Sequence, residues 1–271
     1  MSDIAVTDRN LLSAAAGGIR QPNLLGDSAT MIVRSLRLSR RNVEVLLTSL
    51  ILPVILMLLF VYLFGGAINT GTEYVSYVVP GVLVLCAGFG SATTAISVSQ
   101  DMHNGIMDRF RSLDVSGAAV VCGHVAASVV RNAASTVLVF AVAFAIGFRS
   151  AAGLLDWLAA GGILLLFIVA ISALAALVGL LARSPEAANG FTFFLMFLPY
   201  ASSAFVPIST MPGWLQGFSG HQPVTPVIES VRGLLLGTPV GDSPLWAIAW
   251  CTGIFVVAVE LSTLAFRRRT S

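Results

Sequence analysis

The chain carries three histidines and three cysteines, the residue types that most often bind metals or act as nucleophiles. The histidines fall on three separate segments, and the cysteines lie within or beside apolar runs without the spacing of a metal site or a disulfide framework. We therefore interpret the cysteines as small buried hydrophobic residues. These six residues are His103, His124, His221, Cys86, Cys122 and Cys251.

Two further patterns suggest chemistry inside a membrane. Gly88-Phe-Gly-Ser91 loosely resembles an intramembrane serine-protease motif, but no histidine is placed to activate the serine, so small-residue packing is the favoured interpretation. Arg131 and Glu260 lie in apolar runs and could form a proton relay. Because both lie within a few turns of a span end, mutual pairing or snorkelling is favoured. A membrane-embedded enzyme and a proton-coupled carrier remain as alternatives.

The absence of lysine limits what this chain can do with nucleotides. All 15 basic residues are arginine, so the chain has no Walker A loop, which needs a lysine to reach the phosphates. If the protein uses ATP, another chain must bind it. We expect no catalytic residue, no metal and no cofactor on this chain.

Composition identifies the class of protein that must position these residues. Hydrophobic residues make up 56% of the 271 and charged residues only 10%, and the mean hydropathy is +0.90. A soluble domain of this length needs more charge to cover its surface. A spanning helix needs roughly 20 apolar residues. The sequence therefore predicts an all-α membrane protein with six transmembrane helices, at 45–64, 77–98, 124–148, 157–182, 191–209 and 245–266.

The arginines predict the orientation of the spans. With the N-terminus inside, 12 of the 15 arginines fall on the cytoplasmic side, two (Arg149 and Arg232) fall outside, and Arg131 lies within the third span. Positive residues are enriched in cytoplasmic loops. Both termini are therefore expected in the cytoplasm, with the chain in a bacterial cytoplasmic membrane.

Two segments precede the first span. Residues 1–27 are predicted to form a flexible cytoplasmic tail, since they are polar and contain Gly17-Gly18 and Gln21-Pro22. Residues 28–42 alternate apolar and basic side chains, as in an amphipathic helix lying in the membrane interface. The arginines of this helix would face anionic headgroups, or the helix would dock a partner. These arginines are Arg34, Arg37, Arg40 and Arg41.

The cytoplasmic segment 99–117 contains a narrow apolar stripe at helical spacing. Met102, Ile106, Phe110 and Leu113 form the stripe, while charged residues occupy the other faces. Such a helix can insert its stripe into a groove of a partner, or it can lie on the bilayer surface. Periodicity alone leaves both possibilities open.

The outer loop 210–243, between the fifth and sixth predicted spans, has two short semi-apolar stretches, Trp214–Phe218 and Thr225–Leu236. Each is too short to span the membrane and too apolar for an exposed loop, which predicts a re-entrant hairpin. Thr225 is expected to cap the second helix, with Pro226 at its first position. Glu229 and Arg232 share one face of that helix, either as an ion pair or as a gate for the outer exit.

Two of these segments resemble the ABC-2-type permeases, the membrane subunits of bacterial ATP-binding-cassette exporters, and the daunorubicin/doxorubicin-resistance group in particular. The segment after span two is similar to the coupling segment of the family, although Met102-His103-Asn104 and Asp114-Val115 depart from its usual pattern. The matching residues there are Gly105, Ile106, Asp108, Arg109, Phe110, Arg111 and Leu113. The outer loop matches the re-entrant motif at Pro207, Met211, Pro212, Trp214, Leu215, Gln216, Pro223, Thr225, Pro226, Glu229, Arg232 and Gly233.

The resemblance implies an assembly and a task. A six-span permease domain, residues 43–271, would pair with a second permease copy or paralogue and with ABC ATPase subunits that hold ATP and magnesium. Closure of the ATPases would push on the interfacial helix and the coupling segment. The cargo would be an amphipathic drug, polyketide, lipid or polysaccharide, moved out of a bacterial cell. No nucleic acid is expected as a partner.

Overall fold

The computed structural model describes Gly26 and residues 29–35, 43–104 and 117–270, and every regular element among them is a helix. Residues 29–35 form one short helix, here called the N-terminal helix. The other elements are α3 (Val43–Leu59), η1 (Phe60–Phe64), α4 (Tyr74–His103), α6 (Gly117–Ala145), α7 (Leu154–Leu181), α8 (Pro185–Leu195), η2 (Ile208–Thr210), α9 (Gly213–His221), α10 (Val224–Leu236) and α11 (Ser243–Thr270).

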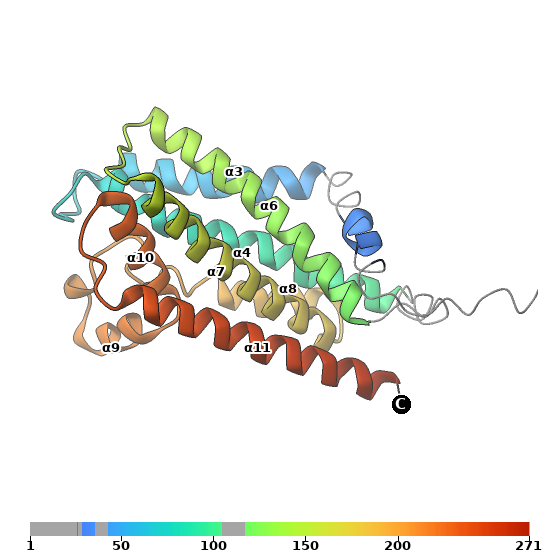
Figure 1. Cartoon of the computed structure of the whole chain (residues 1–271). Helices are drawn as coiled ribbons and strands as arrows, with labels where there is room; N and C mark the ends of the chain where they lie inside the picture. Colours follow the sequence, from blue (N-terminus) through green and yellow to red (C-terminus); the bar gives the residue numbers. More distant parts are fainter. Residues whose placement is uncertain (1–25, 27–28, 36–42, 105–116, 271) are drawn as a thin grey trace, which may run out of the picture.

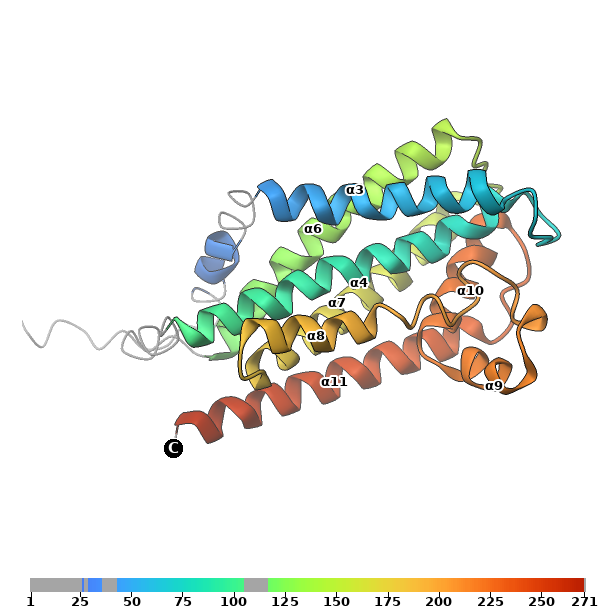
Figure 2. The same ribbon diagram turned by 180° about the vertical axis from the view of Figure 1, so that it is seen from behind.

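The long helices run side by side between two ends of an elongated bundle (Figures 1 and 2). One end holds the N-terminal helix, the last turn of α4 and the C-terminus; we call it the Asp101 end. The opposite end holds α9 and α10; we call it the Arg232 end. α4, α7 and α11 all run from the Arg232 end to the Asp101 end, and α6 runs in the opposite direction between α4 and α7.

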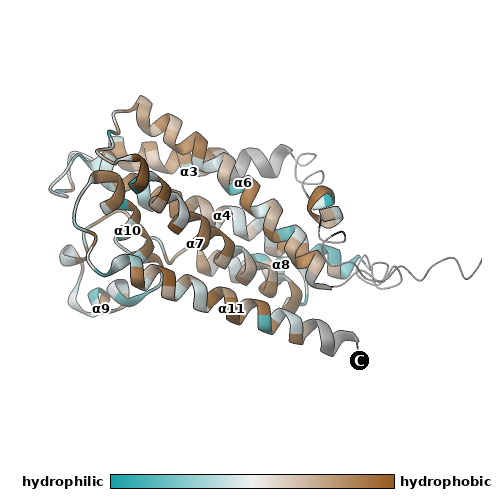
Figure 3. Ribbon diagram, viewed as in Figure 1, coloured by the Kyte–Doolittle hydropathy of each residue, from teal (hydrophilic) through white to brown (hydrophobic). Residues whose placement is uncertain are grey.

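Four described helices are long and apolar enough to cross a membrane: α4, α6, α7 and α11. They coincide with four of the predicted spans, and apolar residues predominate along them (Figure 3). The most apolar stretch of α4 is 89% buried in the protein, whereas those of α6 and α11 are 28% and 22% buried. α4 is therefore the central helix, and α6 and α11 present open apolar faces suited to lipid or to another chain.

The other two predicted spans differ from the expectation. The first, 45–64, is helical throughout but changes from α-helix to π-helix at Phe60. The fifth, 191–209, is wrong as one continuous helix, because α8 ends at Leu195 and the chain continues in turns to Phe205. Pro199 explains the break, since a proline ring clashes with the carbonyl four residues earlier, here that of Leu195.

α4 lies so close to its neighbours that side chains would not fit at several points. A Cβ on Gly81 would lie 2.6 Å from the Cβ of Ala204, and one on Gly179 of α7 would collide with the carbonyl oxygen of Ala95. Small residues allow helices to approach closely where lipid gives no hydrophobic drive for association. Gly81 and Gly179 therefore serve packing within the chain.

Three serine hydroxyls link α4, α6 and α7 inside the bundle. Ser172 Oγ of α7 donates to Ser128 Oγ of α6 at 2.8 Å and lies 3.3 Å from Ser91 Oγ of α4. All three serines are at most 2% exposed. Ser91 thus takes part in helix packing, as the sequence favoured. Of the cysteines, Cys86 and Cys251 are buried as expected, whereas Cys122 is exposed.

Candidate functional site

Asp101, near the last turn of α4, is the centre of an ionic cluster. Its carboxylate accepts two hydrogen bonds from Arg34, from Nη1 to Oδ2 at 2.9 Å and from Nη2 to Oδ1 at 3.3 Å. His124 Nε2 of α6 lies 3.1 Å from the same Oδ2. The side chains of Asp101 and His124 are 11% and 8% exposed. We call these three residues the Asp101 cluster; it joins the N-terminal helix, α4 and α6.

The N-terminal helix is positioned by direct packing on α6. Met31 is buried, and a Cβ on Gly123 would lie 2.9 Å from the backbone of Met31. Arg34 was predicted to face headgroups, but the structure directs its guanidinium to Asp101, because a nearly buried carboxylate offers a bidentate partner. The other arginines predicted for this helix lie outside the described residues: Arg37, Arg40 and Arg41.

The predicted coupling residues from Gly105 to Leu113 also lie outside the described residues, so their assignment stays a prediction. Of the apolar stripe, only Met102 is described. It packs against a cluster of Val98 and Leu180 within the bundle. α4 ends one residue later, at His103, so the described part of the chain includes the first residues of the segment 99–117 and stops just before the predicted coupling residues.

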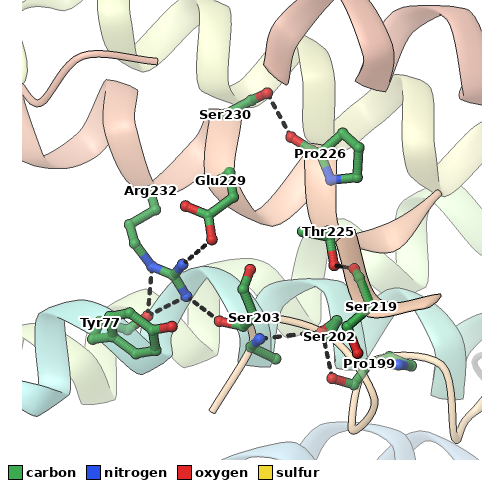
Figure 4. A network of polar contacts seen from close by, with 11 residues as sticks. Tyr77, Pro199, Ser202, Ser203, Ser219, Thr225, Pro226, Glu229, Ser230 and Arg232 are labelled. Carbon is green, nitrogen blue, oxygen red and sulfur yellow. Dashed lines mark hydrogen bonds and ion pairs between the residues drawn. The ribbon is translucent and has the colours of Figure 1, made fainter. Parts of the chain in front are cut away.

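At the opposite end of α4, the guanidinium of Arg232 on α10 makes a dense set of contacts (Figure 4). Nε and Nη2 donate to the carbonyl oxygen of Tyr77 at 3.1 and 3.0 Å, and Nη2 donates to that of Ser203 at 2.6 Å. Nη1 donates to Glu229 at 2.8 Å, and the guanidinium carbon lies 3.7 Å from the centre of the Tyr77 ring. These four residues form the Arg232 network, which joins α10, α4 and the turns after α8.

The Arg232 network changes the interpretation of the predicted ion pair. The pair between Glu229 and Arg232 is confirmed, but the Arg232 side chain is 8% exposed and that of Glu229 is 40% exposed. The guanidinium donates most of its hydrogen bonds to main-chain carbonyl oxygens, and only one to the glutamate. Arg232 is therefore primarily a structural connection between elements, with Glu229 at its solvated edge.

The two short helices of the loop 210–243 are confirmed as α9 and α10, with one corrected start. Thr225 was predicted to cap the second helix, but α10 begins at Val224 with Pro223 before it. Thr225 Oγ1 donates to the carbonyl oxygen of Ser219 at 2.6 Å, so it connects α10 back to α9. Pro226 accepts a hydrogen bond from Ser230, and it is tolerated in the first turn, where backbone N–H groups have no helical partner.

The remaining residues of the outer motif shape turns or remain exposed. Pro207 and Pro212 directly precede η2 and α9, where a fixed φ favours the start of a helix. Gln216 donates to the carbonyl oxygen of Met211 at 2.8 Å, and Leu215 lies beside it, partly exposed. Trp214 is 80% exposed. A Cβ on Gly233 would lie 2.5 Å from Val240, so this glycine allows the chain to fold back after α10.

The proton-relay pair and the enzyme alternative gain no support from the described residues. Arg131 donates to Thr94 Oγ1 at 2.7 Å and to the Gly90 carbonyl oxygen at 3.4 Å, while Glu260 lies exposed on α11. None of the ion pairs in the described part of the chain joins Arg131 to Glu260. The predicted mutual pairing of these two residues is therefore wrong, since Arg131 finds polar partners on α4.

The sequence analysis did not identify Asp101, Tyr77 or Ser203 as functional partners. Tyr77 and Ser203 contribute main-chain carbonyls, and side-chain patterns cannot reveal such contacts. Asp101 and His124 could have been found, because each lies at the same predicted end of an adjacent span. A charged residue at such a position usually has a partner nearby.

Comparison with known proteins assigns the family. Residues 28–236 match the model of the family described as ABC-2 type transporter. The chain is 31% identical, over 97% of its length and 93% of the relative, to the daunorubicin resistance ABC transporter permease protein DrrB1 of Streptomyces coeruleorubidus. It is 25% identical to the probable doxorubicin resistance permease DrrC of Mycobacterium tuberculosis, over 85% of the chain and 84% of the relative. It is also 25% identical to the inner membrane transport permease YadH of Escherichia coli, over 82% of the chain and 88% of the relative. The chain belongs to the ABC-2 type transporter family.

Proposed function

We propose that this chain is the transmembrane permease subunit of an ATP-driven exporter in a bacterial cytoplasmic membrane. The observation that carries the proposal is the similarity to a drug-resistance permease over 97% of the chain. Four long apolar helices agree with a multi-pass membrane subunit. The lack of lysine agrees with ATP hydrolysis on a separate subunit, which would hold ATP and magnesium.

The proposed topology has six membrane passages with both termini in the cytoplasm. α3 with η1, and α8 with the turns to Phe205, would supply the two passages beyond the four long helices. The turns after α8 need protein cover at membrane depth, because lipid offers no partner for free backbone groups. A second permease subunit, the same chain or a paralogue, would provide it. The Asp101 end would face the cytoplasm, and α9 and α10 would form the re-entrant outer hairpin.

In this assembly, the ATPase acts on the permease through the segment that follows α4. Phe110 is the proposed anchor in the ATPase and Arg109 is its charged neighbour. Anchors of this kind contribute on the order of 2 kcal/mol or more. The cargo is proposed to be an amphipathic drug, polyketide, lipid or polysaccharide, in line with the drug-resistance names of two relatives.

The test is reconstitution with the ATPase encoded beside the gene, if one is present. The purified chain alone should hydrolyse no ATP, and the complex should hydrolyse it. Phe110→Ala should reduce copurification of the ATPase while membrane insertion stays normal. ATP hydrolysis by the isolated chain would contradict the proposal, and unchanged complex formation by Phe110→Ala would favour a helix that merely lies on the bilayer.

A further inference from the structure

The last residue of α4, His103, lies between two main-chain carbonyl groups on different elements. Its Nδ1 lies 2.8 Å from the carbonyl oxygen of Ser99, one turn earlier in α4. Its Nε2 lies 2.6 Å from the carbonyl oxygen of Arg183, in the connection between α7 and α8. The imidazole therefore bridges the end of α4 and that connection; we call this the His103 bridge.

The chemistry of the two acceptors determines the protonation state that satisfies the bridge. A carbonyl oxygen only accepts hydrogen bonds, and a neutral imidazole has a single N–H donor. In the neutral ring, one of the two nitrogens would direct its lone pair at a carbonyl oxygen. Both contacts are favourable only when the ring carries two protons and a positive charge. The geometry of the bridge therefore fits an imidazolium better than a neutral ring.

The charged groups around His103 are consistent with that state. Asp101, on the same helix, is engaged by Arg34 and His124. Glu186 precedes the fifth predicted span, 191–209. Hydrogen bonds from Ser184 and the backbone hold the pKa of its carboxyl below the ordinary value, and the charge of His103 acts in the same direction. Arg183, whose carbonyl oxygen forms the bridge, is also charged.

The bridge lies where α4 meets the predicted coupling segment. Asn104 donates its N–H to the Gln100 carbonyl oxygen and ends the helix, and the next residue, Gly105, is the first of the predicted coupling residues. Arg34 binds the end of α4 from the N-terminal helix, and His103 binds it to the α7–α8 connection. His103 is exposed at this end of the bundle.

We propose that His103 is a proton-sensitive positioning residue, whose imidazolium fixes the end of α4 to the α7–α8 connection and thereby positions the coupling segment. Histidine changes its charge between about pH 5 and 8. The charged form makes both hydrogen bonds, so the bridge is complete at low pH and loses one bond as the pH rises. Coupling to the ATPase should therefore weaken as the pH rises. This expectation rests on the proposed function.

The first measurement needs only the full-length permease in detergent. Hydrogen exchange of the backbone amides of residues 184 and 186–188 is compared between wild type and His103→Phe at each pH. Comparison at the same pH cancels the intrinsic effect of pH on exchange. We expect at least threefold slower exchange in wild type at pH 5.5 and a ratio near one at pH 8.5. If the ratio of the exchange rates of wild type and His103→Phe were the same at pH 5.5 and at pH 8.5, the proposal would be overturned.

Two variants sharpen this result. His103→Arg places a permanently charged group with several N–H donors at the same position, so its protection should exceed that of His103→Phe at both pH values. His221→Gln is the matched control, since His221 lies at the Arg232 end and its Nδ1 contacts only the Gly217 carbonyl oxygen, within its own helix. It should keep the wild-type ratio at each pH. Loss of the pH dependence in His221→Gln would contradict the assignment to His103.

The second measurement uses the permease–ATPase complex in vesicles with the ATPase side outward. ATP hydrolysis stimulated by the permease should fall at least threefold between pH 6 and 8 relative to His103→Arg. Equal profiles for these two proteins would refute the positioning role even where the exchange result holds. If no complex forms at all, the proposed function fails, while the exchange measurement still decides the state of the bridge.

Discussion

The Arg232 network and the Asp101 cluster lie at opposite ends of α4, and they use different kinds of acceptor. Arg232 donates mainly to main-chain carbonyls, which cannot titrate and belong to elements fixed by helix packing. In the Asp101 cluster, an arginine and a histidine meet a carboxylate, so every contact is between side chains. A contact to the main chain persists as long as the fold does, whereas a contact between side chains can be broken without unfolding. The difference indicates a rigid Arg232 end and an adjustable Asp101 end.

The largest effect should come from removing the guanidinium of the rigid end. Arg232→Ala leaves buried carbonyl groups without their donor and Glu229 without its partner, and should cost about 3 kcal/mol or more. Arg232→Lys should not restore stability, because one ammonium cannot reproduce the fork of donors. Thermal unfolding in detergent measures this. Arg149→Ala is the control, since exposed Arg149 donates to the Phe144 and Phe148 carbonyls and should matter little. Equal losses for Arg149 and Arg232 would argue against a rigid end.

A packing substitution near the same end should have the next largest effect. Gly81→Ala places a Cβ 2.6 Å from that of Ala204 and should cost about 1–3 kcal/mol through a forced shift of the chain. Gly88→Ala, two turns further along α4, meets no atom within 4 Å and should be neutral or slightly stabilising. The midpoints of thermal unfolding of the two variants compare them directly. Similar midpoints would mean that the turns after α8 move away easily.

At the adjustable end, Asp101→Asn should affect coupling more than stability. Arg34 is 26% exposed, so loss of the ion pair should cost only about 1–2 kcal/mol. Transport and stimulated ATP hydrolysis should fall severalfold. A double-mutant cycle with Arg34→Gln checks the pairing, because the double variant should lose little more than either single one. Unfolding as severe as that of Arg232→Ala would remove the distinction between the ends.

The smallest effect is expected at the solvated edge of the rigid end. Glu229→Gln leaves the guanidinium with its carbonyl partners, and the glutamate is 40% exposed, so the cost should stay below about 1 kcal/mol. Transport should remain near the wild-type level. A stable Glu229→Gln protein that has lost transport would instead support the gating version of this pair. Measurement of export in vesicles and of thermal unfolding on the same preparation separates the two outcomes.

The sequence predicted what depends on local pattern. Long apolar runs identified α4, α6, α7 and α11. The sequence analysis did not predict the break in the fifth span, although Pro199 was a visible signal for it. Hydropathy is averaged over a window of many residues, so it does not respond to a single proline that lacks a backbone N–H group. The pair Glu229–Arg232 followed from helical spacing, whereas the carbonyl of Tyr77 carries no signal in any side-chain pattern.

The chain of hydroxyls at Ser91, Ser128 and Ser172 has a mechanical consequence for the transporter. Together with the close approach of α4 to α7 at Gly179, it stiffens α4, α6 and α7 against sliding past one another. A push on the end of α4 would then rotate these three helices as one lever. The flexibility that a transporter needs to open first to one side and then to the other must therefore come from elements other than α4, α6 and α7. The π-turn after α3 is one place where the described backbone departs from the α-helix and can act as a joint.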